Sequence, residues 1–169
     1  MLMSSPPSPA NDSFYAATYA QDGMQMAPLE DHEQQEQPVM LIDDSEIVRK
    51  IIEVSFQRIG IPVSIFPDGI TAIRALAQHQ VTVPRLLLLD IGLPRMNGYE
   101  VASILRSKKE FEQTIIVMLS GHDGMVDRLR SRLIGARDFI AKPFRVSQVV
   151  NTVCSYLEID PGLPDPENS

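Results

Sequence analysis

Hydrophobic residues between positions 38 and 157 form five short apolar runs, and each run is followed by a longer segment with helical periodicity. A run that is apolar throughout, such as Leu86-Leu87-Leu88-Leu89, predicts a strand that is covered on both faces. Apolar residues three and four positions apart predict amphipathic helices. The predicted strands are 39–42, 63–66, 86–89, 115–119 and 137–141, and the predicted helices are about 45–59, 70–77, 98–108, 124–134 and 146–157.

Local signals mark the ends of these helices. Ser45 can cap the first helix, and Gly60 can end it. Gly135 follows the fourth helix and can take the left-handed conformation that ends a helix. The first helix has a predicted apolar stripe formed by Ile47, Ile51, Ile52, Val54, Phe56 and Ile59.

This alternation of strands and helices predicts the fold class. It indicates an α/β fold with a doubly wound, parallel, five-stranded sheet and helices on both faces. Ligands of such sheets bind beyond the carboxyl ends of the strands. The residues that follow each strand are therefore the candidates for a functional site.

The two ends of the chain differ in composition from the domain at 38–157. Residues 1–37 are rich in Ser, Pro, Gln, Asp and Glu, and residues 158–169 are rich in Pro and acids. Such segments cannot bury enough apolar surface to offset their ordering entropy, so we predict that both are disordered. A short docking motif within 1–37 is the alternative, formed by Phe14, Tyr15, Tyr19, Met24 and Met26.

The charge of the chain is unevenly distributed. The chain carries 22 acidic and 15 basic residues, a net charge of −7. Ten of the acids lie in 1–37 and 158–169, which contain no Lys or Arg, so 38–157 carries 12 acids and all 15 bases. The predicted domain is therefore mildly basic, although the whole chain is acidic.

Composition also limits where the protein can act. The single cysteine, Cys154, excludes an internal disulfide. No apolar run approaches the ~20 residues that a membrane span needs, and the N-terminus lacks a secretion signal. We expect a reducing, cytoplasmic location without membrane insertion.

Five polar residues close or follow the predicted strands: Asp43, Asp44, Asp90, Ser120 and Lys142. Three carboxylates at one edge of a sheet repel one another. A bound divalent cation or a raised pKa would relieve this repulsion. Because all the donors are oxygen atoms, the expected cation is Mg²⁺, with Mn²⁺ as the alternative.

This set of groups suits phosphoryl transfer. A metal ion and a lysine ammonium neutralise phosphoryl oxygens, and an aspartate can attack phosphorus to form an acyl phosphate. Taken singly, Asp43 and Asp44 could be helix caps, Asp90 a turn residue and Lys142 a surface base. Their joint occurrence at successive strand ends, with Pro143 after the lysine, favours a site.

Longer motifs resemble the receiver domain of response regulators over about 38–157. They are Asp43-Asp44, the segment 90–98 (DIGLPRMNG), Ser120-Gly121 and the segment 135–144 (GARDFIAKPF). Within this family the sequence is most similar to stand-alone CheY-like regulators, including those of pilus motility and phototaxis. The resemblance implies a flavodoxin-like fold with strand order 2-1-3-4-5.

The resemblance also implies how the acidic residues act. Asp90 would be the phosphoacceptor and would share in metal binding. Asp44 would bind Mg²⁺ directly, and Asp43 would bind it mainly through water. The Gly92 carbonyl would complete the metal shell. His122 and Gly92 would occupy positions that tune the lifetime of the phosphoryl group.

Further roles are implied for three residues at the ends of the last two strands. Lys142 would pair with the phosphoryl group, and its peptide bond to Pro143 would be cis. Ser120 would hydrogen-bond a phosphoryl oxygen, where threonine is more common. Phe139 would be the aromatic switch residue, in a position that is often tyrosine.

The resemblance implies a response regulator that receives a phosphoryl group from a histidine kinase or a histidine phosphotransfer protein. Phosphorylation would then switch binding to a protein target. The target would contact the face of the fourth helix, fifth strand and fifth helix, where Arg128 and Arg132 favour an acidic partner, unless this is simply a solvated charged face. No helix-turn-helix segment is present, so no DNA binding is expected. Dimerisation on activation is left open.

Three other functions would use a similar set of residues. A phosphorelay intermediate would pass its phosphoryl group to a histidine phosphotransfer protein. An aspartyl phosphatase of the haloacid dehalogenase type would carry its nucleophile after the first strand in an Asp-x-Asp arrangement, whereas Asp90 follows the third strand. A flavin-binding domain is disfavoured because carboxylates at the phosphate end repel the cofactor. We therefore expect a signalling domain and not a conventional enzyme.

Overall fold

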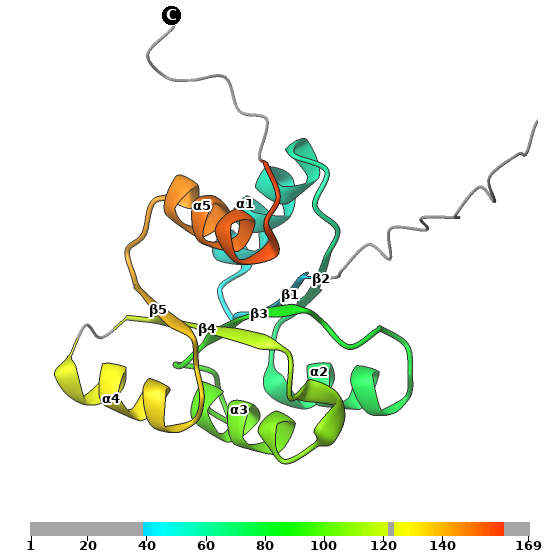
Figure 1. Cartoon of the computed structure of the whole chain (residues 1–169), viewed down its shortest axis with the longest axis vertical. Helices are drawn as coiled ribbons and strands as arrows, with labels where there is room; N and C mark the ends of the chain where they lie inside the picture. Colours follow the sequence, from blue (N-terminus) through cyan, green and yellow to red (C-terminus); the bar gives the residue numbers. More distant parts are fainter. Residues whose placement is uncertain (1–38, 122–123, 161–169) are drawn as a thin grey trace, which may run out of the picture. The chain divides into compact units, whose positions relative to one another are not determined.

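The computed structural model describes residues 39–121 and 124–160. These residues form a parallel sheet in the order β2-β1-β3-β4-β5, with helices on both faces (Figure 1). The strands are β1 (Val39–Ile42), β2 (Val63–Phe66), β3 (Leu86–Asp90), β4 (Ile115–Ser120) and β5 (Asp138–Ala141). The helices are α1 (Glu46–Arg58), α2 (Gly69–Ala77), α3 (Gly98–Arg106), α4 (Met125–Leu133) and α5 (Val146–Leu157), with a 3₁₀ turn η1 (Lys109–Phe111). The predicted fold class and strand order are confirmed.

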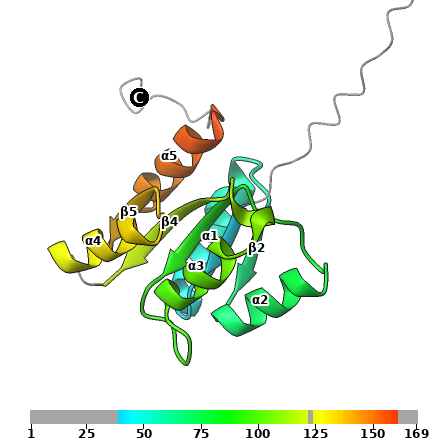
Figure 2. The ribbon, with the colours of Figure 1, turned by 60° about the horizontal axis from the view of Figure 1, so that its bottom comes forward.

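Two hydrophobic cores lie on opposite faces of the sheet. Along β1, Val39 and Leu41 pack into the core that contains residues of α1 and α5. Met40 and Ile42 pack into the core that contains residues of α2 and α3. Figures 1 and 2 show the same division, with α1 and α5 over one face and α2, α3 and α4 over the other. Because both faces are buried, the central strands are apolar throughout, as the sequence predicts.

Several predicted helix ends are confirmed. The Ser45 hydroxyl accepts a hydrogen bond from the Val48 amide at 3.4 Å and caps α1. Gly135 follows α4 with a φ of +79° in the left-handed region. The helix α3 ends at Arg106, two residues before the predicted end, and the Ser107 hydroxyl donates to the Ile104 carbonyl at 2.6 Å.

The predicted apolar stripe of α1 is wrong in part. Ile47 and Ile51 are 72% and 42% exposed, whereas Ile52 and Phe56 are fully buried. Only one side of α1 contacts the sheet and α5, and that side is centred on Ile52 and Phe56. The other apolar residues of the stripe lie beyond or at the edge of this contact.

Among the described residues, no helix is both long and apolar enough to cross a membrane. The predicted disordered segments lie outside this part of the chain, except for residues 158–160. The docking motif proposed within 1–37 and His122 also lie outside it.

Candidate functional site

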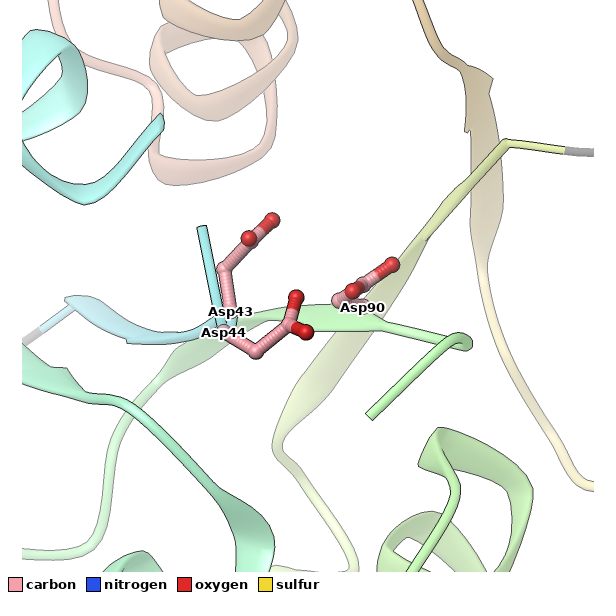
Figure 3. A group of neighbouring side chains, drawn as sticks. All are labelled: Asp43, Asp44 and Asp90. Atoms are coloured by element: carbon pink, nitrogen blue, oxygen red, sulfur yellow. The ribbon is translucent and has the colours of Figure 1, made fainter. Parts of the chain in front are cut away.

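The three acidic residues predicted for the site meet at the carboxyl edge of the sheet. Asp43 and Asp44 follow β1, and Asp90 is the last residue of β3. The strands β1 and β3 are parallel neighbours, with Ile42 opposite Leu89. Figure 3 shows the three side chains together at this edge, and their ligand oxygens all lie within 4.8 Å of one another.

Asp43 and Asp44 have different surroundings. Asp43 is fully buried, and its Oδ1 accepts a hydrogen bond from the Ser45 amide at 2.9 Å. Its Oδ2 contacts Lys142 Nζ at 2.7 Å. Asp44 is exposed. Asp43 thus has a contact on each carboxylate oxygen, while the Asp44 carboxylate is open to solvent.

Asp90 is nearly buried, with an exposed fraction of 4%. Its Oδ1 accepts a hydrogen bond from the Gly92 amide at 3.3 Å and lies 3.2 Å from Lys142 Nζ. Burial raises the pKa of the Asp90 carboxyl above its usual value; the Lys142 ammonium opposes this, and the Asp43 carboxylate adds to it. The site therefore holds more negative charge than Lys142 alone balances.

Lys142 comes to the site from the end of β5. Its amide donates to the Ser120 carbonyl at 2.6 Å, and its peptide bond to Pro143 is cis, as the resemblance implies. Burial lowers the pKa of Lys142, but its contacts with Asp43 and Asp90 outweigh burial, and the net pKa is raised. Lys142 is therefore a fixed positive charge between two carboxylates.

The other predicted residues lie around this centre. Ser120 is buried at the end of β4, opposite Ala141 of β5. Phe139 is half-buried, and the Arg128 guanidinium lies 5.2 Å from the centre of its ring. Gly92 is exposed, and a Cβ there would lie 3.7 Å from Asp90 Oδ2, so the absence of a side chain keeps this approach to Asp90 open.

The structure also shows two residues at the site that the sequence pattern did not indicate. Arg49 Nη1 donates to the carbonyls of Asp43 and Asp44, at 2.8 Å each, and holds the loop that carries them. Gly98 lies against the backbone of Asp90, where a Cβ would collide with the Asp90 carbonyl oxygen. Arg49 binds backbone carbonyls, so no side-chain pattern indicates its role. Gly98 is the last residue of the 90–98 motif, but its contact with the Asp90 backbone is visible only in three dimensions.

The donor set fits a hard divalent cation. Three carboxylates and one ammonium leave an excess of negative charge, and all the donor atoms are oxygens. With such a cation bound, the charges of the ion and of Lys142 could neutralise a phosphoryl group beside Asp90.

Residues 39–154 match the family of the response regulator receiver domain. The chain belongs to this family of phosphoacceptor signalling modules, which are not conventional enzymes. The haloacid dehalogenase and flavin-binding alternatives are thereby set aside.

Individual relatives support this assignment. Protein PilG of Pseudomonas aeruginosa is 30% identical over 119 residues, which cover 70% of this chain and 86% of PilG. The "Probable transcriptional regulator ycf27" of Cyanophora paradoxa is also 30% identical, and the match covers 70% of this chain but only 47% of that protein. The chain thus spans about half the length of that transcriptional regulator.

Solved structures share the fold. The chemotaxis response regulator CheY4 of Vibrio cholerae has a TM-score of 0.64 and 24% identity, over 70% of this chain and 97% of CheY4. The receiver domain of the sensor histidine kinase PA1611 of Pseudomonas aeruginosa has a TM-score of 0.63 and 24% identity, over 72% of this chain and 98% of that domain.

Proposed function

We propose that this protein is a two-component response regulator in which Asp90 accepts a phosphoryl group from the phosphohistidine of a histidine kinase. An Asp90 carboxylate oxygen would attack phosphorus, forming a P–O bond while the P–N bond to histidine breaks and the imidazole nitrogen recovers a proton. The contact of Lys142 Nζ with Asp90, at 3.2 Å within the acidic cluster, is the observation that carries this proposal.

Mg²⁺, or Mn²⁺ in its place, would be held by Asp44, Asp90 and the Gly92 carbonyl, with Asp43 acting mainly through water. The surroundings of the two first aspartates support this division, because Asp43 already contacts Ser45 and Lys142 whereas Asp44 is exposed. The PA1611 receiver domain was solved with a magnesium ion coordinated in its active-site cleft. When bound, the ion would supply positive charge for the phosphoryl oxygens.

Lys142 and Ser120 would serve the phosphoryl group directly. The Lys142 ammonium, held between Asp43 and Asp90, would neutralise one phosphoryl oxygen. The Ser120 hydroxyl would donate a hydrogen bond to another, because β4 lies beside β3 and ends at the same edge of the sheet.

Phosphorylation would change the conformation of Phe139. Movement of Ser120 toward the phosphoryl group would leave space for Phe139, which is half-buried on the neighbouring strand β5. An inward turn of its ring would break the contact with Arg128 and change the face formed by α4, β5 and α5. A protein target would bind that face.

The test uses the intact mass of the full chain after incubation with acetyl phosphate and Mg²⁺. We expect one added phosphoryl group on the wild-type protein and none on Asp90→Asn. The Asp68→Asn variant is the matched control, because Asp68 is a buried carboxylate outside the acidic cluster. Labelling of Asp90→Asn at the wild-type level would refute Asp90 as the acceptor.

Transfer to a second protein separates this function from a phosphorelay. The phosphorylated chain is mixed with a purified histidine phosphotransfer domain, and the label on each protein is followed. Rapid transfer to that domain would favour the relay intermediate, whereas slow hydrolysis on Asp90 favours a switch that binds its target.

A further inference from the structure

The helix α4 turns its apolar residues toward solvent. Its exposed fractions are 85% at Met125, 70% at Val126, 58% at Leu129 and 78% at Leu133, and within α4 only Ser131 is buried. At about 100° per residue, the four apolar residues fall within an arc of roughly 100°. They form one continuous stripe, which we call the α4 stripe, and an exposed apolar stripe of this kind marks an interaction site.

A groove lies beside this stripe, between α3 and α4. Its volume is about 720 Å³. Figures 1 and 2 show the two helices side by side on the same face of the sheet. Leu133 belongs both to the α4 stripe and to the groove, and the remaining apolar lining comes from Met96, Tyr99, Ile104 and Ile134.

Polar contacts join the two helices that form the walls of the groove. The Tyr99 hydroxyl donates to Asp127 Oδ1 at 2.9 Å, which links α3 to the first turn of α4. The Arg130 guanidinium lies 4.9 Å from the centre of the Tyr99 ring. These contacts fix α4 against α3 through polar groups, so the apolar residues of α4 remain available for a partner.

We propose that this α3–α4 groove and the adjoining α4 stripe bind an acidic amphipathic helix of a partner protein. The spacing of Met125, Leu129 and Leu133 places three apolar contacts along about 12 Å, or roughly two turns of a bound helix. Three arginines of α4 border the apolar surface on both of its sides: Arg128, Arg130 and Arg132. On the groove wall Arg95 is paired with Asp68, and Glu100 adds one negative charge. Carboxylates that flank an apolar stripe would complement them.

The same charges disfavour other occupants. A second copy of this chain that packed through the same α4 stripe would place its α4 arginines close to these arginines. A lipid surface would meet the arginines but could not enter a concave groove. The groove differs from the cavity on the β5 side of α4, which Arg137 and Phe139 line, although Arg128 and Arg132 also line that cavity and the two sites adjoin along α4. None of the groove-lining residues belongs to the acidic cluster, so the inference does not rest on phosphorylation of Asp90.

The experiment uses the unphosphorylated full chain as bait for a display library of short helical peptides with randomised apolar and charged positions. We expect the selected peptides to carry apolar residues at i, i+3 or i+4, and i+7, flanked by Asp and Glu. Methyl NMR with a selected peptide should shift the signals of Ile104, Leu129 and Leu133. Fluorescence anisotropy then gives the affinity of each protein variant for that peptide.

Three variants test the site. Leu133→Glu should weaken binding at least tenfold, whereas Ile47→Glu should leave it within twofold, because Ile47 is equally exposed but lies on α1. Arg130→Glu should weaken the acidic peptide and strengthen its lysine-substituted analogue. Circular dichroism confirms that each variant is folded.

Four results with the peptides would overturn the inference, and two further results would assign the surface to another occupant. The four are selection of no helical peptide, selection of basic peptides, methyl chemical-shift changes confined to Ala136 in the cavity on the β5 side of α4, and unchanged binding by Leu133→Glu. Self-association of the wild-type chain that Leu133→Glu abolishes would assign the surface to a second copy. Binding to anionic phosphatidylserine vesicles that exceeds binding to the peptide would assign it to a membrane.

Discussion

Lys142 balances only part of the negative charge that the strand ends bring together. Its ammonium lies 2.7 Å from Asp43 and 3.2 Å from Asp90, and these two carboxylates are almost completely buried. A buried carboxylate without a partner is costly, because it has lost water and gained no opposite charge. The lysine is therefore a structural requirement of the site as well as a candidate ligand of the phosphoryl group.

We expect Lys142→Met to lower the free energy of unfolding by about 3 kcal/mol at neutral pH in EDTA, because both buried carboxylates lose their counter-charge. Urea denaturation measures the change. The control is Lys50→Met, which removes an exposed i,i+3 ion pair with Glu53 and should cost less than about 1 kcal/mol. The double variant Lys142→Met/Asp43→Asn should recover part of the loss, and a further loss in the double variant would contradict this explanation.

A second prediction for a single residue concerns the stability of a Gly98 variant. A methyl group at Gly98 would collide with the carbonyl oxygen of Asp90, a backbone atom that cannot turn aside. Gly98→Ala should therefore destabilise the protein by about 2 kcal/mol and slow phosphorylation by acetyl phosphate, because Asp90 is displaced. Gly124→Ala meets no atom within 4 Å and should cost less than about 1 kcal/mol. Equal effects of the two substitutions would show that the close approach does not matter.

The sequence predicts that some residues belong to the site but does not predict this for others. Asp43, Asp44 and Asp90 are predictable, because a parallel sheet brings the carboxyl ends of its strands to one edge. Gly98 is not, because its constraint comes from the Asp90 backbone eight residues earlier and from the path of the loop between them. Arg49 acts through backbone carbonyls, which any sequence possesses, so no side-chain pattern indicates its partners.

At the scale of elements, the helix ends were more predictable than the buried sides of the helices. Side-chain caps depend on neighbouring residues, and Ser45 does cap α1. The buried side of α1 depends on where the sheet and α5 lie, so the periodicity of Ile47, Ile51 and Ile52 alone did not identify Ile52 as the buried residue. The helix α4 shows the same limit of sequence periodicity, because its apolar stripe faces solvent and not the sheet.

Asp68 gives a prediction for α2, whose N-terminus it caps. Its carboxylate accepts hydrogen bonds from the Thr71 amide at 2.8 Å and hydroxyl at 3.0 Å, and it pairs with Arg95 at 3.1 Å. The Thr71 amide and hydroxyl and the Arg95 charge lower the pKa of Asp68, against the opposing effect of burial. Asp68→Ala should cost about 1 kcal/mol at neutral pH.

The sign of the pH dependence follows from this lowered pKa. The stabilisation is complete above the ordinary value near 3.8 and is lost as the pH falls through the lower value of the folded state. The difference between wild-type and Asp68→Ala in urea denaturation should therefore shrink below that range. A difference that grows on acidification would contradict the assignment. Thr71→Val tests the same cap from the other partner and should show part of the effect.

At the scale of the whole molecule, the sequence predicts the sheet type and the two helical layers, because both follow from the alternation of strands and helices along the chain. Five strands that alternate with helices lead to a parallel sheet covered on both faces. The strand order came from the resemblance to receiver domains, because many orders satisfy the same alternation. The polar contacts that hold α4 to α3, such as Tyr99 with Asp127, join residues 28 positions apart and required the structure.

Mg²⁺ should stabilise the whole fold, because the acidic cluster assembles only when β1 and β3 are paired. A ligand that binds the folded state alone raises the free energy of unfolding by RT ln(1 + [L]/Kd), or about 1.4 kcal/mol at ten times its Kd. Urea denaturation at increasing Mg²⁺ concentration should show this rise for the wild-type protein and lose it for Asp44→Asn. Glu46→Gln removes an exposed acid just outside the cluster and should retain the rise. A denaturation midpoint that does not respond to Mg²⁺, or that responds equally in Asp44→Asn, would show that these carboxylates do not hold the ion.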